Sequence, residues 1–509
     1  MNLWNAFVAV SDANPDAPAL LLGESTISYG ELRALAERCS AALFHSGIGR
    51  GDVVAFHLPK RGETYALLIA ALRLGAPYVF IDPKSPAERN QRVIEQVRPA
   101  ILFTSGELEN ADRKVIRLPT AADGTRWLDG LERGGAPSAS AVTGADPAYI
   151  MFTSGSTGEP KGAVIPHQGV LHLMAWARAV VLGAPGQRFT NINPLHFDNS
   201  VFDIYCGLLN GAALVPIETS EVTNPATWVK TARAGGASVV FAVPTLFLVL
   251  DQLGLLTPAA LPEVRTFLFG GEGYPIAKLR DFHARFGGRA RLINVYGPTE
   301  TSCICSSIEL RREHLEGSDN EFPPLGRMHD SFSYAILDEE QRPMVRDGIG
   351  ELWIGGPCVG LGYYANAEET AVRFRQDPRQ DRYRSIYYRS GDLVREDDDG
   401  RLWFHGRVDN QVKIRGHRIE LEEIDLAVQS IPGVRRAVAV VLAGPDGGEL
   451  AVAFHADRLI AADEVQALCK QKLPVYMQPA RIFQLDDLPR NTNGKLARLA
   501  TRALLEKMG

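Results

Sequence analysis

The sequence predicts an α/β fold, with a large domain over residues 1–408 and a small α+β domain over residues 409–509. Three observations lead to this prediction. Up to about residue 145, short apolar runs alternate with helical patterns, which is typical of parallel sheets with flanking helices. Residues 350–364 are a β-type stretch punctuated by glycines, and the composition changes near residue 409, where a compact helix and strand unit begins.

Composition excludes several classes of protein. The chain has 509 residues, 45% of them hydrophobic and 22% charged, which is typical of a globular protein with about three domain-sized units. A net charge of -6 without a basic run argues against nucleic acid as a partner. The N-terminus lacks a signal-like segment and no apolar run reaches the roughly 18 residues of a membrane helix. We therefore expect a cytoplasmic protein without a membrane partner.

The cysteines point to reduced thiols rather than to a disulfide framework. There are six of them, scattered along a long chain. Cys303 and Cys305 lie two residues apart, but no further Cys or His lies nearby, so we predict packing residues on a strand and no zinc site.

The elements follow in chain order. Residues 27–32 open a helix, and residues 53–58 form a buried strand. An apolar run over residues 148–152 predicts a strand that leads into an exposed loop. Further core strands are predicted over residues 239–245 and 266–272, and the second ends in a glycine pair that lets backbone lie flat against a ligand.

The loop over residues 152–162 suits phosphate. Glycines let backbone N–H groups approach an anion, hydroxyl side chains add donors, and Lys161 supplies a positive charge. Lys161 is followed by Gly162 rather than by Ser or Thr, so this is no Walker loop. No serine here has a glycine two residues before and two after it, so it is no nucleophile elbow. Taken alone, the run also fits a flexible surface loop.

In full, the loop resembles the phosphate loop of the adenylate-forming superfamily, which includes acyl-CoA ligases, luciferases and the adenylation domains of nonribosomal peptide synthetases. Further motifs follow in the family's order along the whole chain, among them residues 294–301 and 388–393. Residues 388–393 are expected to place Asp392 on a tight glycine turn, and the resemblance implies that Asp392 accepts the ribose hydroxyls. The resemblance implies an enzyme that uses ATP and Mg²⁺. It also implies the following ATP-binding residues: Thr153, Ser154, Gly155, Ser156, Thr157, Gly158, Lys161, Gly271, Glu272, Asn294, Tyr296, Gly297, Asp392 and Arg407.

Catalytic roles follow from the same resemblance. Thr299 is expected to donate to the α-phosphate and Glu300 to hold Mg²⁺, a hard ion that prefers oxygen ligands. Lys495 matches the catalytic lysine of the adenylation step. Asp409 matches the hinge about which the C-terminal domain rotates, and Lys413 the lysine brought to the active site in the second state.

A second set of residues describes the substrate pocket. Asp198 matches the carboxylate that binds the substrate's amino group in amino-acid-activating members, where aryl-acid-activating domains commonly have Asn. Read without the resemblance, Asp198 is as readily a helix N-cap. Phe197 matches the aromatic that flanks the carboxylate site. The pocket positions carried over by motif are Asp198, Asn199, Phe202, Phe241, Leu268, Gly270, Val295, Cys303, Ile304 and Lys495.

Because Phe202 and Phe241 fill volume and no charged residue faces a side chain, we predict a small neutral amino acid. Proline, D- or L-alanine and a β-amino acid remain open, since residues 197–205 also resemble D-alanine:carrier ligases. The expected acceptor is the phosphopantetheine thiol of a separate carrier protein, because no carrier signature follows before Gly509 and the enzyme looks free-standing. The rival functions are an acyl- or aryl-CoA ligase, which Asp198 disfavours, and a non-catalytic nucleotide-binding protein, which the presence of Glu300 and Lys495 disfavours.

Overall fold

The computed structural model describes residues 1–106, 115–118, 141–155, 158–183, 185–316, 321–345, 347–444, 448–490 and 496–508. The chain forms two compact units. Unit one comprises Met1–Ile81, Val97–Met151 and Gly162–Val408, and unit two comprises Asp82–Gln96, Phe152–Lys161 and Asp409–Gly509. The last change of unit falls between Val408 and Asp409, while two earlier segments also belong to unit two. The contiguous domains over residues 1–408 and 409–509 stay a prediction.

The largest sheet of unit one has nine strands in the order β15-β14-β13-β12-β11-β9-β10-β1-β2. Its inner strands are parallel, and β14, β15 and β2 are antiparallel to their neighbours. The strands are β1 Pro18–Leu22, β2 Ser25–Ser28, β9 Arg188–Asn191, β10 Ala213–Pro216, β11 Val239–Ala242, β12 Thr266–Gly270, β13 Arg291–Tyr296, β14 Ser306–Leu310 and β15 Arg327–Met328. The predicted core strands near residues 240 and 268 are therefore β11 and β12.

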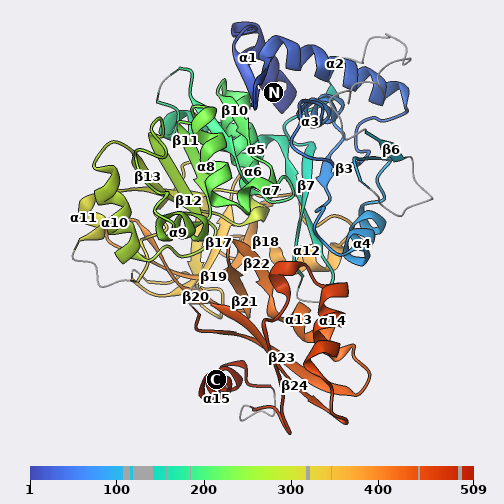
Figure 1. Cartoon of the computed structure of the whole chain (residues 1–509), viewed down its shortest axis with the longest axis vertical. Coiled ribbons are helices and arrows are strands. Elements are labelled where there is room, and N and C mark those ends of the chain that lie inside the picture. The colour runs from blue at the N-terminus through green and yellow to red at the C-terminus, as the bar shows by residue number, and fades with distance from the viewer. Residues whose placement is uncertain are drawn as a thin grey trace. The chain divides into compact units, whose positions relative to one another are not determined.

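Helices flank these strands, as the α/β prediction requires (Figure 1). They are α5 His167–Val180, α6 Asn199–Val201, a π-helical segment Phe202–Gly207, a 3₁₀ turn Leu208–Asn210, α7 Thr219–Val222, α8 Pro225–Ala234, α9 Pro244–Gln252, α10 Ile276–Phe286, a 3₁₀ turn Thr299–Thr301 and α11 Arg312–Leu315. Proline begins α8 and α9, where its missing N–H costs no helical hydrogen bond.

A six-stranded sheet has the order β6-β5-β3-β4-β7-β8. Its strands are β3 Val54–His57, β4 Tyr78–Phe80, β5 Ile101–Thr104, β6 Val115–Arg117, β7 Pro147–Thr153 and β8 Lys161–Pro166. The pairings of β3 with β4 and β5, of β5 with β6 and of β4 with β7 are parallel, as predicted from the alternating pattern. The helices of this part of the chain are α1 Leu3–Ala13, α2 Tyr29–His45, α3 Gly62–Leu74 and α4 Ala87–Val97.

The helix predicted to open within residues 27–32 is α2. It begins at Tyr29 because Ser28 caps it: the Ser28 side chain accepts from the N–H of Glu31, and the Glu31 side chain accepts from the N–H of Ser28. The Tyr29 ring is fully buried, and its hydroxyl donates toward the carbonyls of Leu208 at 2.5 Å and Ala212 at 2.8 Å. The start of α2 is thereby tied to the turn that follows the π-helical segment.

This contact gives a stability prediction. A Tyr29→Phe variant removes the one hydroxyl proton that two buried carbonyls share, so we expect the free energy of unfolding to fall by about 1–3 kcal/mol. Thermal and urea unfolding midpoints measure the change. Tyr383→Phe is the matched control, because Tyr383 is 69% exposed and its loss of a hydroxyl should leave both midpoints unchanged. Equal midpoints for the two variants would show that the Tyr29 contact contributes nothing.

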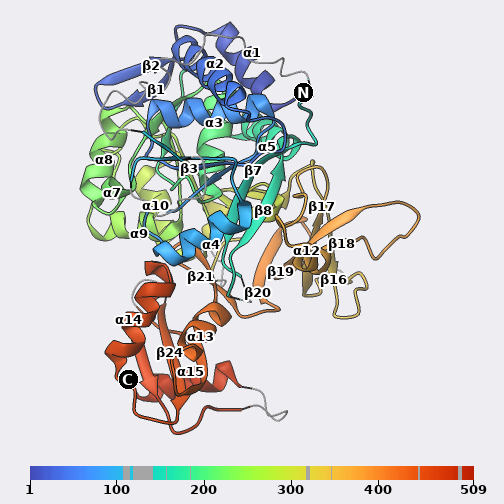
Figure 2. The ribbon, with the colours of Figure 1, turned by 90° about the vertical axis from the view of Figure 1, so that its right-hand side faces the viewer.

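A further sheet of unit one is antiparallel, with the order β16-β17-β19-β18 and with β20 paired to β19 (Figure 2). Its elements are β16 Ser333–Leu337, β17 Gly350–Gly355, β18 Phe374–Gln376, β19 Ile386–Glu396, β20 Leu402–Arg407 and the helix α12 Ala367–Arg373. The expectation that Asp392 lies on a tight glycine turn is wrong. Asp392 lies inside β19, next to Gly391, whose φ of 76° falls where the pairing of β19 with β17 is irregular.

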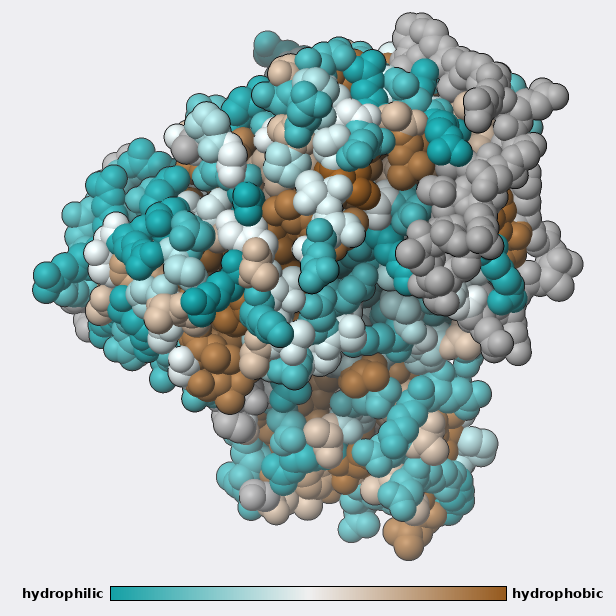
Figure 3. All heavy atoms as spheres, turned by 45° about the horizontal axis from the view of Figure 1, so that its top comes forward, coloured by the Kyte–Doolittle hydropathy of each residue, from teal (hydrophilic) through white to brown (hydrophobic). Residues whose placement is uncertain are grey.

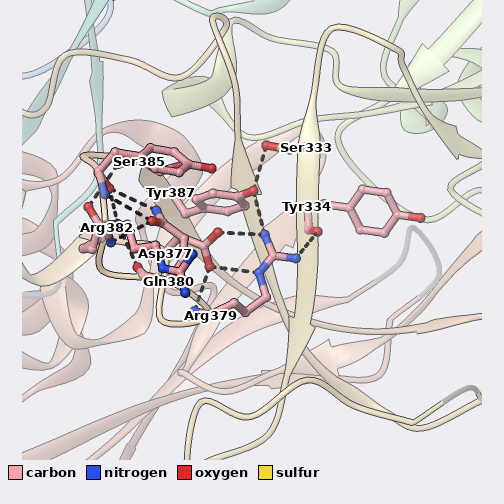
Figure 4. Close-up of polar contacts among 10 residues, drawn as sticks. Ser333, Tyr334, Asp377, Arg379, Gln380, Arg382, Ser385 and Tyr387 are labelled. Atoms are coloured by element: carbon pink, nitrogen blue, oxygen red, sulfur yellow. Dashed lines mark hydrogen bonds and ion pairs between the residues drawn. The ribbon is translucent and has the colours of Figure 1, made fainter.

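The segment between β18 and β19 is held onto this sheet by one arginine (Figure 4). Arg379 donates from Nε to Asp377 at 2.8 Å, from Nη2 to the Tyr387 hydroxyl at 2.7 Å and from Nη1 to the Tyr334 carbonyl at 3.2 Å. The Tyr387 hydroxyl donates in turn to Ser333 Oγ at 2.8 Å. Asp377 is thus a buried, ion-paired carboxylate.

Unit two has a two-stranded and a three-stranded sheet. Its elements after residue 408 are β21 Gln411–Ile414, β22 His417–Glu420, α13 Leu421–Gln429, β23 Val434–Leu442, β24 Glu449–Ala456, α14 Ala462–Lys472, a 3₁₀ turn Val475–Met477, β25 Arg481–Gln484 and α15 Arg498–Met508. The strands β23 and β24 are antiparallel, and β25 joins β24 in parallel. The helix α13 packs with these strands around a core that includes Ile424, Val428, Val452 and Phe454.

One face of the molecule is drawn with all its atoms. On the face drawn in Figure 3, hydrophilic side chains predominate and apolar residues form small separate patches. Among the described residues, every helix falls short of the length and apolarity needed to cross a membrane.

Candidate active site

Asp198 and Thr299 form the first polar contact of the site. Asp198 directly precedes α6, but its side chain makes no capping hydrogen bond there. Instead its Oδ2 accepts from the Thr299 hydroxyl at 2.6 Å. The N-cap alternative is therefore not realised, and the contact brings together two residues that are 101 positions apart and that were predicted for the amino group and the α-phosphate.

The π-helical segment Phe202–Gly207 brings Phe202 against Phe241 of β11. The two rings lie 5.1 Å apart between centroids at 74°, an edge-to-face pair, and both are buried. A π-helical turn widens the backbone and occurs frequently at functional sites. Phe197 and Asn199, predicted for the same site, lie half-buried beside Asp198.

The remaining pocket positions lie at the ends of β12 and β13 and just after them. Leu268, Val295, Cys303 and Ile304 are all buried. Gly270 ends β12, and a Cβ there would meet the Val295 carbonyl oxygen at 2.3 Å, so only glycine fits. Burial raises the pKa of the Cys303 thiol well above its ordinary value, and the thiol is neutral.

Cys303 and Cys305 do not lie on a strand, contrary to the prediction, because β14 begins only at Ser306. Ser302 and Cys303 both have left-handed backbone, with φ of 61° and 79°. A Cβ at Gly297 would meet the Cys303 carbonyl oxygen at 2.3 Å, so this turn packs directly on the Gly-Pro break after β13. Within the described part of the chain, no three His, Cys, Asp or Glu side chains are grouped to hold a metal.

Glu300 lies at the centre of the 3₁₀ turn Thr299–Thr301 and is completely buried. Its Oε1 accepts from the Tyr363 hydroxyl at 2.7 Å, and its carbonyl accepts from the N–H of Gly360 at 2.8 Å. Tyr363 was not predicted as a site residue, because it follows a glycine-rich stretch that reads as scaffold. A buried carboxylate held in one orientation has the donor chemistry of a Mg²⁺ ligand.

Asp392 is held by two residues that were also predicted to bind the nucleotide. Its Oδ2 accepts from the Tyr296 hydroxyl at 2.5 Å, and its Oδ1 forms an ion pair with Arg407, which also donates to the Ser390 carbonyl at 3.1 Å. Burial raises the pKa of the Tyr296 hydroxyl, and the neighbouring Asp392 charge acts in the same direction. Tyr296 is thus a neutral donor at physiological pH.

The other predicted nucleotide residues of unit one lie where β12 and β13 end. Gly271 has a φ of 90° and is exposed, so its backbone is open to a planar ligand. Glu272 accepts from the N–H of Thr245 at 2.7 Å, and Asn294 donates to the Pro324 carbonyl at 2.8 Å. The first contact ties the residue after Gly271 to the start of α9, and the second ties β13 to the segment at Pro324.

The predicted phosphate loop belongs to unit two, and its residues 156 and 157 lie outside the described part of the chain. The loop is less exposed than expected: Ser154 and Lys161 are each 4% exposed, and Lys161 is the first residue of β8. A Cβ at Gly155 would meet the Glu159 carbonyl oxygen at 1.9 Å, and the Gly155 carbonyl accepts from the N–H of Gly158 at 2.9 Å. Glycine is therefore required for the turn.

Asp409, Lys413 and Lys495 were predicted for the catalytic cycle. Asp409 is the first residue of unit two after Val408, and its Oδ1 accepts from the N–H of Gln411 at 3.3 Å. Lys413 is half-buried on β21, paired opposite Arg418 of β22. Lys495 lies outside the described residues. The roles of all site residues named so far stay predictions.

Comparison with protein families gives two matches. Residues 7–364 match the model for AMP-binding enzyme, and residues 423–495 match that for the AMP-binding enzyme C-terminal domain. The relatives include Surfactin synthase subunit 3 of Bacillus subtilis, 34% identical over 96% of this chain. The chain spans only 38% of that relative's length, and 9% of the length of Malpibaldin synthetase of Mortierella alpina.

One relative is matched over nearly its full length. The L-proline--[L-prolyl-carrier protein] ligase of Pseudomonas fluorescens is 32% identical, with 97% of each chain covered. Among solved structures, an NRPS protein containing adenylation and PCP domains, bound to a vinylsulfonamide inhibitor, superimposes with a TM-score of 0.84 at 26% identity, over 99% of this chain and 84% of that one. The predicted fold class is confirmed, as is the predicted superfamily: the chain belongs to the family of AMP-binding enzymes.

Proposed function

We propose that the protein activates a small neutral amino acid with ATP, forming an aminoacyl-adenylate and pyrophosphate, and then transfers the aminoacyl group to the phosphopantetheine thiol of a separate carrier protein. Membership of the AMP-binding family implies the use of ATP. The observation that carries the amino-acid assignment is the hydrogen bond between Thr299 and Asp198, because it sets a carboxylate for an ammonium group beside the hydroxyl assigned to the α-phosphate.

The first step joins two anions, so catalysis depends mainly on positioning and charge neutralisation. A carboxylate oxygen of the amino acid attacks the α-phosphorus of ATP, a P–O bond forms, and the bond to pyrophosphate breaks. In this proposal Asp198 holds the ammonium group, Lys495 bridges the carboxylate and the α-phosphate, and the loop at Thr153–Lys161 holds the departing pyrophosphate.

The Thr299 hydroxyl has one proton and serves one acceptor at a time. In the structure it donates to Asp198. When a substrate ammonium group takes over the charge of Asp198, the Thr299 proton becomes available to the α-phosphate. The amino acid therefore prepares the site for the oxygen on which negative charge grows in the transition state.

Glu300 is the residue that fits Mg²⁺. No cluster of three acidic, His or Cys ligands occurs in the described part of the chain, so the ion would take most of its oxygen ligands from phosphates and water, as Mg²⁺ commonly does. Mg²⁺ bound there would neutralise charge on the phosphates. The Tyr363 hydroxyl orients the Glu300 carboxylate for this purpose.

In the second step the carrier thiol attacks the acyl carbon of the adenylate, a thioester forms and AMP leaves with the bonding electrons. We propose that rotation at Asp409 withdraws Lys495 and presents Lys413 for this step. The full-length likeness to a prolyl-carrier-protein ligase supports a carrier protein as the acceptor.

ATP–pyrophosphate exchange without carrier protein tests the first step. We expect one of proline, L- or D-alanine, glycine or a β-amino acid to stimulate exchange, and fatty and benzoic acids to leave it at background. The opposite result, with exchange only for acids that lack an amino group, would show an acyl- or aryl-CoA ligase.

An Asp198→Asn variant sharpens this test. The amide still accepts from Thr299 but cannot neutralise an ammonium group, so we expect the KM of the amino acid to rise about 100-fold, or about 2.7 kcal/mol. The KM of ATP, measured in the same assay, is the internal control and should stay within about twofold. An unchanged KM for the amino acid would remove Asp198 from the substrate site.

A further inference from the structure

A buried carboxylate that the proposed mechanism does not use lies directly behind the pocket wall. Asp203 follows Phe202 in the π-helical segment and is completely buried. Its Oδ2 accepts from the side-chain amides of Asn191 at 3.0 Å and Asn193 at 3.1 Å. Its Oδ1 is buried without a hydrogen-bond partner in the described part of the chain. Burying a charge this deeply is costly and calls for an explanation.

Asn193 links Asp203 to the other side of the pocket. Its Nδ2 also donates to the main-chain carbonyl of Phe241 at 2.9 Å, so the two protons of one amide group serve the carboxylate and the carbonyl. The pairing of β11 with β9 sets Val239 opposite Phe189, so Asn191, the last residue of β9, lies level with Phe241. The Phe241 carbonyl therefore lies where β9 ends, and the Asn193 side chain, two residues further along the chain, donates to it.

Tyr65 and Lys60 hold Asn191, the other amide that donates to Asp203. The Tyr65 hydroxyl donates to Asn191 Oδ1 at 2.6 Å, and the Lys60 ammonium donates to the carbonyls of Asn191 and Ile217 at 2.7 Å each. Lys60 is 4% exposed, and burial lowers its pKa while the Asp203 charge opposes that change. The Asp203 carboxylate thus accepts from two side-chain amides and interacts with a buried cation, and one of the amides belongs to Asn191 at the end of β9.

We propose that Asp203 and Asn193 are positioning residues for substrate selection: the Asn193 amide fixes Phe202 and Phe241 against each other, and so sets how long a substrate side chain the pocket accepts. The inference rests on the proposed function, since it assumes that these two rings close the amino-acid site. The rings touch at 5.1 Å between centroids, and one hydrogen-bonded amide joins the chain segments that carry them.

The test compares amino acids of increasing length in pyrophosphate exchange. The quantity is the kcat/KM of L-leucine or L-phenylalanine divided by that of the best small amino acid. In Asn193→Ala and Asp203→Ala we expect this ratio to rise at least about tenfold, the lower end of what one methylene group is worth in a pocket. The double variant should exceed neither single variant, because both substitutions break the same connection.

Asp377→Ala is the matched control, because Asp377 is also a buried carboxylate of unit one but is bound to Arg379 in the β16–β20 sheet (Figure 4). It should lower the thermal midpoint and leave the ratio unchanged. The inference is overturned if the Asn193 and Asp203 variants lose activity equally for all amino acids. If Asp203→Ala does not fold, Asn193→Ala decides the question, since it cuts the link at the Phe241 carbonyl.

Pyrophosphate exchange by the wild-type enzyme distinguishes a failure of the positioning role from a failure of the proposed function, on which that role rests. If the wild-type enzyme exchanges with no amino acid, the proposed function fails and the inference fails with it. If it exchanges with a small amino acid and the ratio does not move in the variants, only the positioning role is wrong.

Discussion

A Glu300→Gln variant is expected to exchange pyrophosphate 10² to 10³-fold more slowly at saturating substrates, on the order of the effect of removing one preorganised electrostatic group. Glutamine keeps the shape of the side chain and an oxygen that accepts from Tyr363. It loses the negative charge of Glu300, which we propose binds Mg²⁺. We also expect the Mg²⁺ concentration for half-maximal exchange to rise, which steady-state assays over a range of Mg²⁺ would measure.

Two further variants show whether the loss in Glu300→Gln comes from the missing charge. Tyr363→Phe leaves the charge and removes one hydrogen bond, so its loss should be smaller, about tenfold for about 1.4 kcal/mol. Lys495→Ala is the reference for a lost catalytic charge and should abolish exchange without changing the Mg²⁺ requirement. If Glu300→Gln exchanges at the wild-type rate, Glu300 does not act on the phosphates.

An Arg407→Met variant is expected to lose both stability and ATP binding. Arg407 and Asp392 have side chains only 8% and 3% exposed, and removing the arginine leaves a buried carboxylate without its cation. Breaking a buried pair in this way costs about 3–5 kcal/mol. The thermal midpoint of the variant should fall accordingly, and ATP binding, measured by calorimetry, should weaken beyond detection at ordinary concentrations.

A double variant distinguishes the two effects. Arg407→Met with Asp392→Asn removes both charges, so the stability should recover toward that of the wild type, because no uncompensated charge remains buried. ATP binding should stay lost, since the amide cannot replace the carboxylate expected to accept the ribose hydroxyls. Recovery of ATP binding in the double variant would contradict the role assigned to Asp392.

The α/β fold was predictable because local signals and burial agree. The strands β11 and β12 are short apolar runs that a parallel sheet buries on both faces, so their sequence alone identifies them. The start of α2 was predictable to within two residues, because Ser28 and Glu31 form a local capping box. Signals of this kind depend only on neighbours in the chain.

The parts that were not predicted depend on distant residues. Gly391 next to Asp392 indicates a turn locally, but pairing with β17 and β20 keeps that segment in a strand. Asp198 has the local pattern of an N-cap, and only Thr299, far along the chain, draws its carboxylate away. The buried connection from Asp203 to Phe241 runs through Asn193, which carries no motif, so no sequence pattern identifies it.

The left-handed turn at Ser302 and Cys303 has a consequence for engineering. Side-chain libraries intended to change substrate preference would naturally randomise Cys303, since it lines the proposed pocket. With a φ of 79° that position accepts glycine, asparagine or aspartate at low cost and resists valine, isoleucine and threonine. The backbone conformation at position 303 therefore limits which side chains a library can introduce there, whatever the substrate.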